Sequence, residues 1–135
     1  MKRLIFLVLI STQTYSCMTN KIQRTHIESI EFGSGGGFTG LYVTYKVNLN
    51  DRSIQKGDRA PKKLRSQQMR MLLKQLNKCD LFQIDFNRPY NFTYFIEVKG
   101  EENNKIIWGD PTFNPPEEIT KLSDVLTGLT KEVDF

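Results

Sequence analysis

The sequence has few of the residues from which metal and catalytic sites are commonly built. It contains one histidine, His26, and two cysteines, Cys17 and Cys79. A structural zinc site takes about four Cys or His ligands, and a disulfide-dense secreted scaffold needs several cysteine pairs, so both classes are excluded. The aspartates of the chain show no spacing that selects an acid–base pair. We therefore expect no catalytic residue, no bound metal and no cofactor.

A long apolar run is also missing, which bears on how the chain could attach to a membrane. The longest run, Leu4–Ile10, is far shorter than the ~20 residues of a membrane-spanning helix. It follows two basic residues and precedes polar, mostly small ones, and this is the layout of a signal peptide. Thr14 and Ser16 are small residues that favour cleavage before Cys17.

Cys17 would be the first residue of the exported protein. The pair Ser16-Cys17 is similar to the end of a bacterial lipobox, so we expect Cys17 to carry a lipid anchor and Cys79 to be a buried free thiol. The alternative is a soluble periplasmic or secreted protein with a Cys17–Cys79 disulfide. The expected organisation is a signal peptide at residues 1–16, a tether at 17–26 and a single globular domain at 27–135.

Excess positive charge is small once the signal peptide is removed. The full chain has a formal charge of +4, but residues 17–135 hold 17 Lys and Arg against 15 Asp and Glu. An exported protein does not meet nucleic acid, so we expect none as a partner. Positive charge is nevertheless concentrated at residues 51–78, where anionic lipid or an acidic protein surface could bind. The basic face predicted there comprises Lys62, Lys63, Arg65, Arg70 and Lys74.

Hydrophobic periodicity predicts four strands and two helices. Alternating apolar residues indicate strands at Ile27–Phe32, Leu41–Leu49, Phe92–Lys99 and Lys105–Trp108, the first ending at Gly33. Apolar residues at helical spacing, namely Met69, Leu72, Leu73 and Leu76, indicate a helix at Leu64–Lys78. A second helix is expected from Pro116 to about Leu129.

The order of these elements favours an α+β fold. Short connectors within each strand pair predict two hairpins, which would form a four-stranded antiparallel sheet with both helices packed on one face. We expect a core that includes Tyr45, Val47, Leu72, Leu76, Ile96, Val98 and Trp108.

The glycine-rich stretch Gly33–Gly40 contains a formal match to G-x-G-x-x-G but no G-x-x-x-x-G-K-[ST] motif. A dinucleotide site requires a helix after such glycines, whereas this stretch leads into the clearest strand of the sequence, which argues against phosphate binding. One interpretation is a wide turn whose glycines supply positive φ. The other is a partner-binding loop that presents Phe38, formed by Gly35, Gly36, Gly37, Phe38, Thr39 and Gly40.

Two short segments carry a resemblance to known proteins. The stretch Ser34–Gly40 before an alternating strand, followed by an amphipathic helix and a hairpin, resembles emfourin-type inhibitors of thermolysin-like metalloproteases. Together with Ile106–Asp110 it is also similar to small bacterial lipoproteins that share a G-G-G-F-T-G segment. The resemblance covers roughly residues 27–129 and implies a non-catalytic inhibitor.

We therefore expect a membrane-anchored lipoprotein of the bacterial cell envelope. Its expected function is that of a binding module such as a protease inhibitor, with an exported protease or an envelope component as partner. The alternative is a structural or assembly-related envelope lipoprotein that uses the basic face. A small enzyme is the least favoured class.

Overall fold

The structure is a computed structural model in which residues 26–134 are described. The predicted signal peptide, the predicted lipidation site at Cys17 and nearly all of the predicted tether lie outside these residues. Among residues 26–134, no helix is long and apolar enough to cross a membrane.

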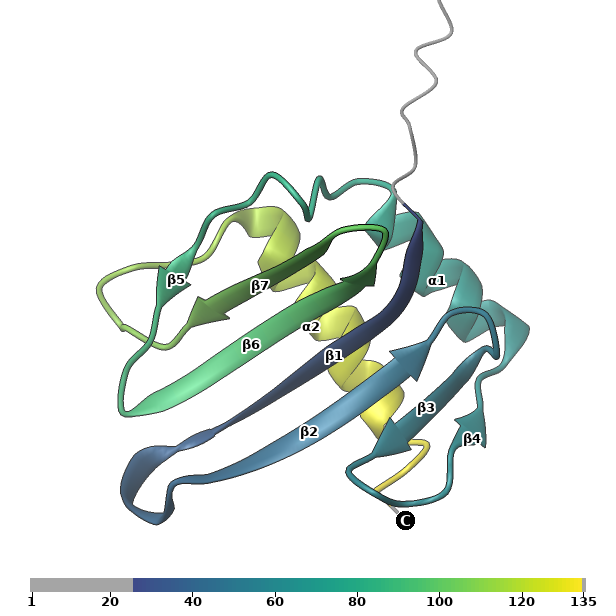
Figure 1. Cartoon of the computed structure of the whole chain (residues 1–135), viewed down its shortest axis with the longest axis horizontal. Coiled ribbons are helices and arrows are strands. Elements are labelled where there is room, and N and C mark those ends of the chain that lie inside the picture. Colours follow the sequence, from purple (N-terminus) through teal and green to yellow (C-terminus); the bar gives the residue numbers. More distant parts are fainter. Residues whose placement is uncertain (1–25, 135) are drawn as a thin grey trace, which may run out of the picture.

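The described residues form one sheet and two α-helices (Figure 1). The strands are β1 (Ile27–Gly36), β2 (Leu41–Asn48), β3 (Ser53–Lys56), β4 (Lys62–Lys63), β5 (Asn87–Arg88), β6 (Phe92–Gly100) and β7 (Asn103–Trp108). The helices are α1 (Ser66–Leu76) and α2 (Glu117–Thr130), and a 3-10 turn at Gly37–Thr39 joins β1 to β2.

The α+β class is confirmed, but the prediction of a four-stranded antiparallel sheet is wrong. The sheet has seven strands in the order β4-β3-β2-β1-β6-β7-β5, and it is mixed because β5 runs parallel to β7. The two predicted hairpins, β1–β2 and β6–β7, form its centre, joined where β1 pairs with β6. The additional strands β3, β4 and β5 are two to four residues long and mostly polar. Hydrophobic alternation cannot reveal strands this short.

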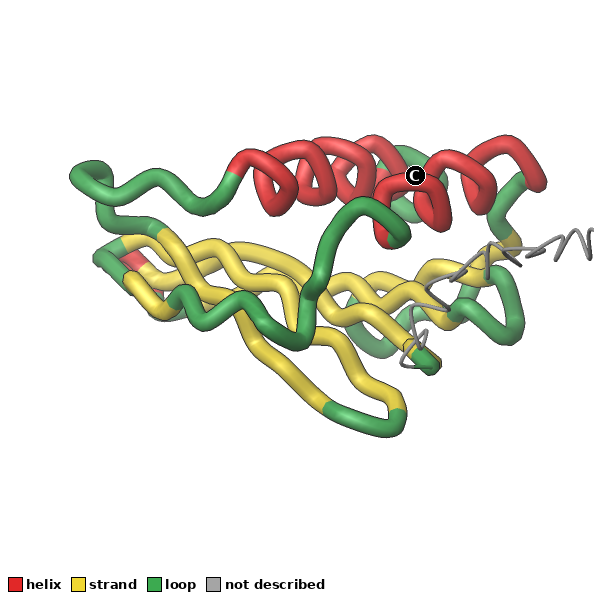
Figure 2. Tube along the Cα trace, turned by 90° about the horizontal axis from the view of Figure 1, so that it is seen from above, coloured by secondary structure: helices red, strands yellow, loops and turns green. Residues whose placement is uncertain are grey.

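Both helices lie on the same side of the sheet, as Figure 2 shows, and the core is the layer between them. Its fully buried side chains come from both layers, for example Ile30, Ile96, Leu72 and Leu122. Five of the side chains expected in the core are buried, namely Val47, Leu72, Leu76, Ile96 and Val98. Tyr45 and Trp108 are only partly buried.

The first helix is shorter than predicted, and its apolar face is narrower. It spans Ser66–Leu76 because the chain at Leu64 is still extended, with its N–H donating to the Arg52 carbonyl oxygen at 2.8 Å. The Gln68 side chain accepts the Arg65 N–H at 2.8 Å and so satisfies a donor before the first turn. Leu73, which was assigned to the buried face, is 44% exposed. The second helix begins after Pro116, as predicted.

The first strand continues past its predicted end at Gly33 to Gly36. Glycine is usually unfavourable within a strand, but here β2 approaches β1 unusually closely. A Cβ atom at Gly33 would collide with the Val43 carbonyl oxygen, and one at Gly35 would lie 2.5 Å from the Tyr42 Cα. These glycines therefore allow two backbones to pack against each other, and β1 and β2 extend as a pair beyond the helices (Figure 1).

Candidate protein-interaction site

The turn between β1 and β2 is built from glycines in conformations that other residues rarely adopt. Gly36, Gly37 and Gly40 have φ angles of 101°, 65° and 63°, in the region open to glycine at little cost. The Gly37 N–H donates to the carbonyl oxygen of Asn91, in the loop before β6. This hydrogen bond holds the turn against a neighbouring segment.

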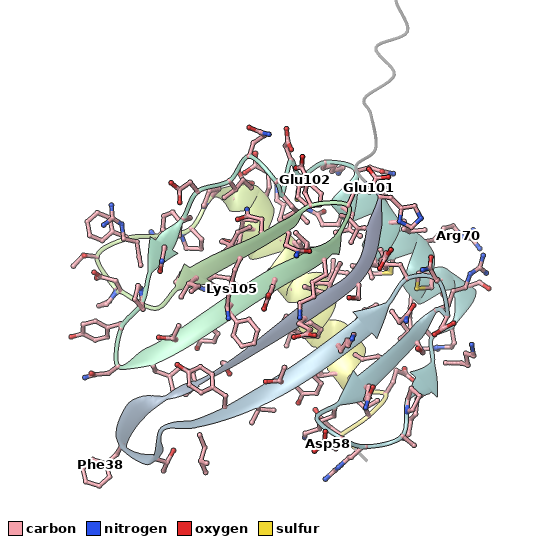
Figure 3. All side chains as sticks on the ribbon, in the orientation of Figure 1. Phe38, Asp58, Arg70, Glu101, Glu102 and Lys105 are labelled. Carbon is pink, nitrogen blue, oxygen red and sulfur yellow. The ribbon has the colours of Figure 1, made fainter. Side chains whose placement is uncertain are left out.

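The predicted partner-binding residues divide between this turn and the strand before it. Gly35 and Gly36 belong to β1, and Gly35 is buried. Gly37, Phe38, Thr39 and Gly40 are exposed at the end of the molecule. The ring of Phe38 is completely exposed and points away from the sheet (Figure 3). The structure thus presents Phe38 as a side chain without a role in the core.

Four further apolar side chains are exposed beside the turn on the helix side of the sheet. Leu41 and Val43 of β2 are 73% and 47% exposed, and Phe92 and Tyr94 of β6 are 47% and 44% exposed. They share a face with Val47 and Ile96, which are buried farther along the same strands because the helices cover them there. We call Phe38, Leu41, Val43, Phe92 and Tyr94 the apolar tip surface.

Small residues of β1 run through the middle of the apolar tip surface. Gly36 is paired with Leu41 on one side and with Phe92 on the other, and Ser34 is paired in the same way with Val43 and Tyr94. The larger side chains therefore stand on either side of a strand that contributes almost no side-chain volume. A partner can approach the backbone of β1 between them.

Aromatic packing supports one side of the apolar tip surface. The Tyr94 ring stacks on Trp108 of β7 with 5.8 Å between centroids and an interplanar angle of 15°. Phe92 meets Tyr94 edge to face at 5.4 Å. Such contacts restrict the rings, so less side-chain entropy is lost when a partner binds them.

The opposite face of the sheet is polar over much of its area. Glutamates and lysines of neighbouring strands alternate there and pair with each other. The Nζ–Oε distances are 3.9 Å for Lys46–Glu31, 3.0 Å for Lys99–Glu31, 3.9 Å for Lys99–Glu97 and 3.7 Å for Lys105–Glu97. Lys105 also lies 4.8 Å from the centroid of the Phe95 ring (Figure 3). Because these charges already have partners, this face suits contact with solvent.

The predicted basic residues are all exposed but do not form one site. Lys62 and Lys63 lie on β4 and Arg65 precedes α1, while Arg70 and Lys74 are exposed residues of α1. Figure 3 shows Arg70 pointing away from the sheet. Arg65 pairs with Glu132 at 3.1 Å, and the Lys63 ammonium donates to the Asp51 carbonyl oxygen at 2.6 Å. Part of the local positive charge therefore serves to hold the C-terminal segment and the β2–β3 turn.

Two other side chains that could carry chemistry, Cys79 and Asp110, form hydrogen bonds within the fold. Cys79 is half-buried and has no disulfide partner within residues 26–134; its Sγ donates to the Glu118 carbonyl oxygen at 3.5 Å, and burial raises its pKa. The Thr112 hydroxyl and backbone N–H donate to Asp110 at 2.6 and 2.9 Å, which lowers the pKa of that carboxyl group. Within residues 26–134, no group of three or more His, Cys, Asp or Glu side chains could hold a metal ion.

Sequence reasoning missed the exposure of Leu41, Val43, Phe92 and Tyr94. Alternation identifies which residues share a face, but it does not show how far the covering helices reach. One signal was available, since no charged residue occurs from Phe32 to Tyr45 although both strands reach the surface there.

No protein-family model matches the chain, and no curated protein is similar to it.

Proposed function

We propose that the chain is an exported, lipid-anchored and non-catalytic module that binds a protein partner on the apolar tip surface. The observation that carries the proposal is the exposure of Phe38, Leu41, Val43, Phe92 and Tyr94 at one end of the sheet. A contiguous apolar patch on a folded protein is costly to leave in water and is typical of interaction sites. The aromatic members are of the type that dominates binding energies.

The direction of β1 agrees with an anchor at the N-terminal side of the domain. Ile27 and Gly36 are the two ends of β1, and ten extended residues separate them by about 30 Å. The β1–β2 turn therefore lies at the end of β1 opposite to its start (Figure 1), and the apolar tip surface lies beside this turn. With Cys17 held in a membrane, the surface would face outward, where an exported protein can reach it. The emfourin resemblance makes a thermolysin-like protease the first partner to test.

The proposal is tested by partner capture. The lipidated protein in detergent is immobilised and exposed to a native envelope extract and, separately, to thermolysin. Phe38→Ala with Leu41→Ser should reduce retention of a captured partner at least tenfold. The matched control is Arg70→Ala with Lys74→Ala, which removes charge from exposed residues of α1. Equal retention by the tip variant and the unchanged protein would contradict the proposal.

Arg70 and Lys74, the two predicted basic residues that lie on α1, support a second function, that of an assembly-related envelope lipoprotein. Arg70 and Lys74 are one turn apart on α1, and both are exposed. Binding through them would fade as ionic strength rises, because exposed charges are screened over about 10 Å at 0.1 M salt. Retention that is lost in the Arg70→Ala, Lys74→Ala variant and at high salt would favour this function over the first.

A further inference from the structure

One edge of β2 is covered by its neighbour β3 along only half of its length. It pairs with β1 from Leu41 to Asn48, but with β3 only from Tyr45 to Asn48. The last contact on this side is the hydrogen bond from the Gly57 N–H to the Thr44 carbonyl oxygen, at 2.9 Å. Figure 1 shows β3 beside one half of β2 and no strand beside the other half on this side. We call Leu41–Val43 the free β2 edge.

Tyr42 carries the hydrogen-bonding groups of the free β2 edge. The N–H and C=O groups of a strand residue point to the same side, and this side alternates along the strand. Since Thr44 bonds toward Gly57, the Tyr42 N–H and C=O also point outward, away from β1. Within residues 26–134, no backbone group pairs with them. They form a donor and acceptor pair at the spacing that a further strand would require.

A hollow adjoins the free β2 edge where β3 turns away. The Arg59 N–H donates to the Lys56 carbonyl oxygen at 3.0 Å, and Gly57 has a φ of 51°, so the chain reverses immediately after β3. The resulting hollow has a volume of about 480 Å³ and is lined by residues 42–44 and 56–59. Asp58, one of the lining residues, lies on the loop after β3 (Figure 3). A chain extended along Tyr42 would continue into this space.

The free β2 edge also lacks the usual protection against strand pairing. Natural edge strands are commonly blocked by a lysine, a proline, a bulge or a covering loop. The segment Gly40–Thr44 has no charge and no proline, and three of its residues, Tyr42, Val43 and Thr44, are of types that favour strands. Leu41 and Val43 face the helix side, and Tyr42 faces the opposite side.

We propose that the free β2 edge receives an extended segment of a partner polypeptide, which pairs with Tyr42 as an additional antiparallel or parallel strand. This inference rests on the proposed function, because it specifies how the partner meets the tip. The part of the segment beside Leu41–Val43 is uncharged and carries apolar side chains at alternate positions, where they extend the apolar tip surface. Main-chain hydrogen bonds supply affinity in this mode, and the alternate side chains supply specificity.

A second copy of the chain fits the free β2 edge less well than a partner segment does. In a copy, the residues before Leu41 turn away through Gly37–Thr39, so its own extended edge is limited to about three residues. Such a contact spans about 10 Å, and a stable interface needs a much larger buried area. A partner segment can stay extended across both Tyr42 and the hollow.

The experiment uses the full-length protein in detergent and a phage-displayed library of random heptapeptides as the probe. Selected peptides should show apolar residues at alternate positions. Each is then synthesised with N-methyl groups on its odd or its even amides. One of the two methylated forms should bind at least tenfold more weakly, because only one set of amides faces β2. The Tyr42 amide should exchange rapidly in the free protein and at least tenfold more slowly in the complex.

Variants separate backbone pairing from side-chain contact. Tyr42→Pro removes both the ring and the outward N–H, whereas Tyr42→Ala removes the ring alone. Peptide binding should therefore be abolished by Tyr42→Pro and at most weakened by Tyr42→Ala. Failure to select peptides would overturn the inference, and so would peptides that bind equally well with either set of amides methylated. So would protection of the Tyr42 amide that depends on protein concentration without peptide, since the edge would then belong to a second copy.

The same variants distinguish this inference from the proposed function. A captured partner that is lost with Phe38→Ala and Leu41→Ser but kept with Tyr42→Pro would leave the apolar tip surface as the binding site and refute strand addition. A partner unaffected by any of these substitutions would refute both.

Discussion

The Tyr45 hydroxyl donates a hydrogen bond to Asp134 Oδ1 at 2.9 Å and so joins β2 to the C-terminal segment. The Lys56 ammonium reaches the same oxygen at 2.6 Å and lies 5.5 Å from the centre of the Tyr45 ring. The hydrogen bonds from Lys56 and Tyr45 lower the pKa of Asp134, while the bond to Asp134 raises the pKa of Lys56. Burial and then this carboxylate raise the pKa of Tyr45.

This relationship predicts a loss of stability in acid. A carboxyl group whose pKa is lowered by folding stabilises the native state above its unfolded pKa of about 3.9, and the contribution disappears as the pH falls through the lower, native value. Asp134→Asn should therefore lower the melting temperature at pH 7, and the difference from the unchanged protein should shrink below about pH 4. Thermal unfolding followed by circular dichroism measures both. Asp58→Asn, on the exposed β3–β4 loop, is the control.

Leu72 and Leu73 test the orientation of α1. They are adjacent in the sequence, yet Leu72 is fully buried and Leu73 is 44% exposed. Leu72→Ala should cost about 2–5 kcal/mol of unfolding free energy through lost burial and the cavity left behind. Leu73→Ala should cost under about 1 kcal/mol, within the range of surface substitutions. Urea denaturation gives both values, and equal costs would show that the helix is rotated from its position in the structure.

Sequence periodicity predicted the buried side of this helix because packing there follows the helical repeat. Periodicity could not exclude Leu73, since the width of the buried stripe depends on where α2 and the sheet lie. For the same reason it assigned Leu41 and Val43 to the correct face but not to the surface. The short strands β3 and β5 carry no alternating pattern of their own, and β5 depends on pairing with β7, from which the whole of β6 separates it in the sequence. The turn at Gly37–Thr39 was the most local feature, and turn chemistry could indicate it.

Gly35 and Gly37 should respond differently to alanine. Gly35→Ala places a Cβ against the backbone of β2, 2.5 Å from the Tyr42 Cα. Gly37→Ala meets no atom within 4 Å, although its φ of 65° disfavours a side chain. We expect a cost of about 1–2 kcal/mol at Gly37 from backbone strain and a larger cost at Gly35, where the strands must separate. A smaller cost at Gly35 than at Gly37 in urea unfolding would contradict the close approach of the two strands.

The expected lipid on Cys17 can be measured directly. The intact mass should exceed that of residues 17–135 by a diacylglyceryl group, with or without an additional acyl chain. Cys17→Ala should release the protein from membranes. Cys79 should then react with iodoacetamide slowly in the native state, because burial raises its pKa, and rapidly in urea. An unmodified Cys17 in a disulfide with Cys79 would instead support the soluble alternative.

Phe38 provides the test that separates a binding loop from a structural turn. Its ring is fully exposed, so Phe38→Ala should change the unfolding free energy by less than about 0.5 kcal/mol. The same substitution should weaken the binding of a captured partner by about 2 kcal/mol or more if the ring enters a pocket on that partner. Isothermal calorimetry with ATP and with NAD should show no binding, because β2 follows the glycines where a phosphate site needs the N-terminus of a helix. Micromolar nucleotide binding that Gly37→Val removes would instead show that the glycine-rich turn binds phosphate. Unfolding caused by Phe38→Ala would place the ring in the core and exclude it from the binding site.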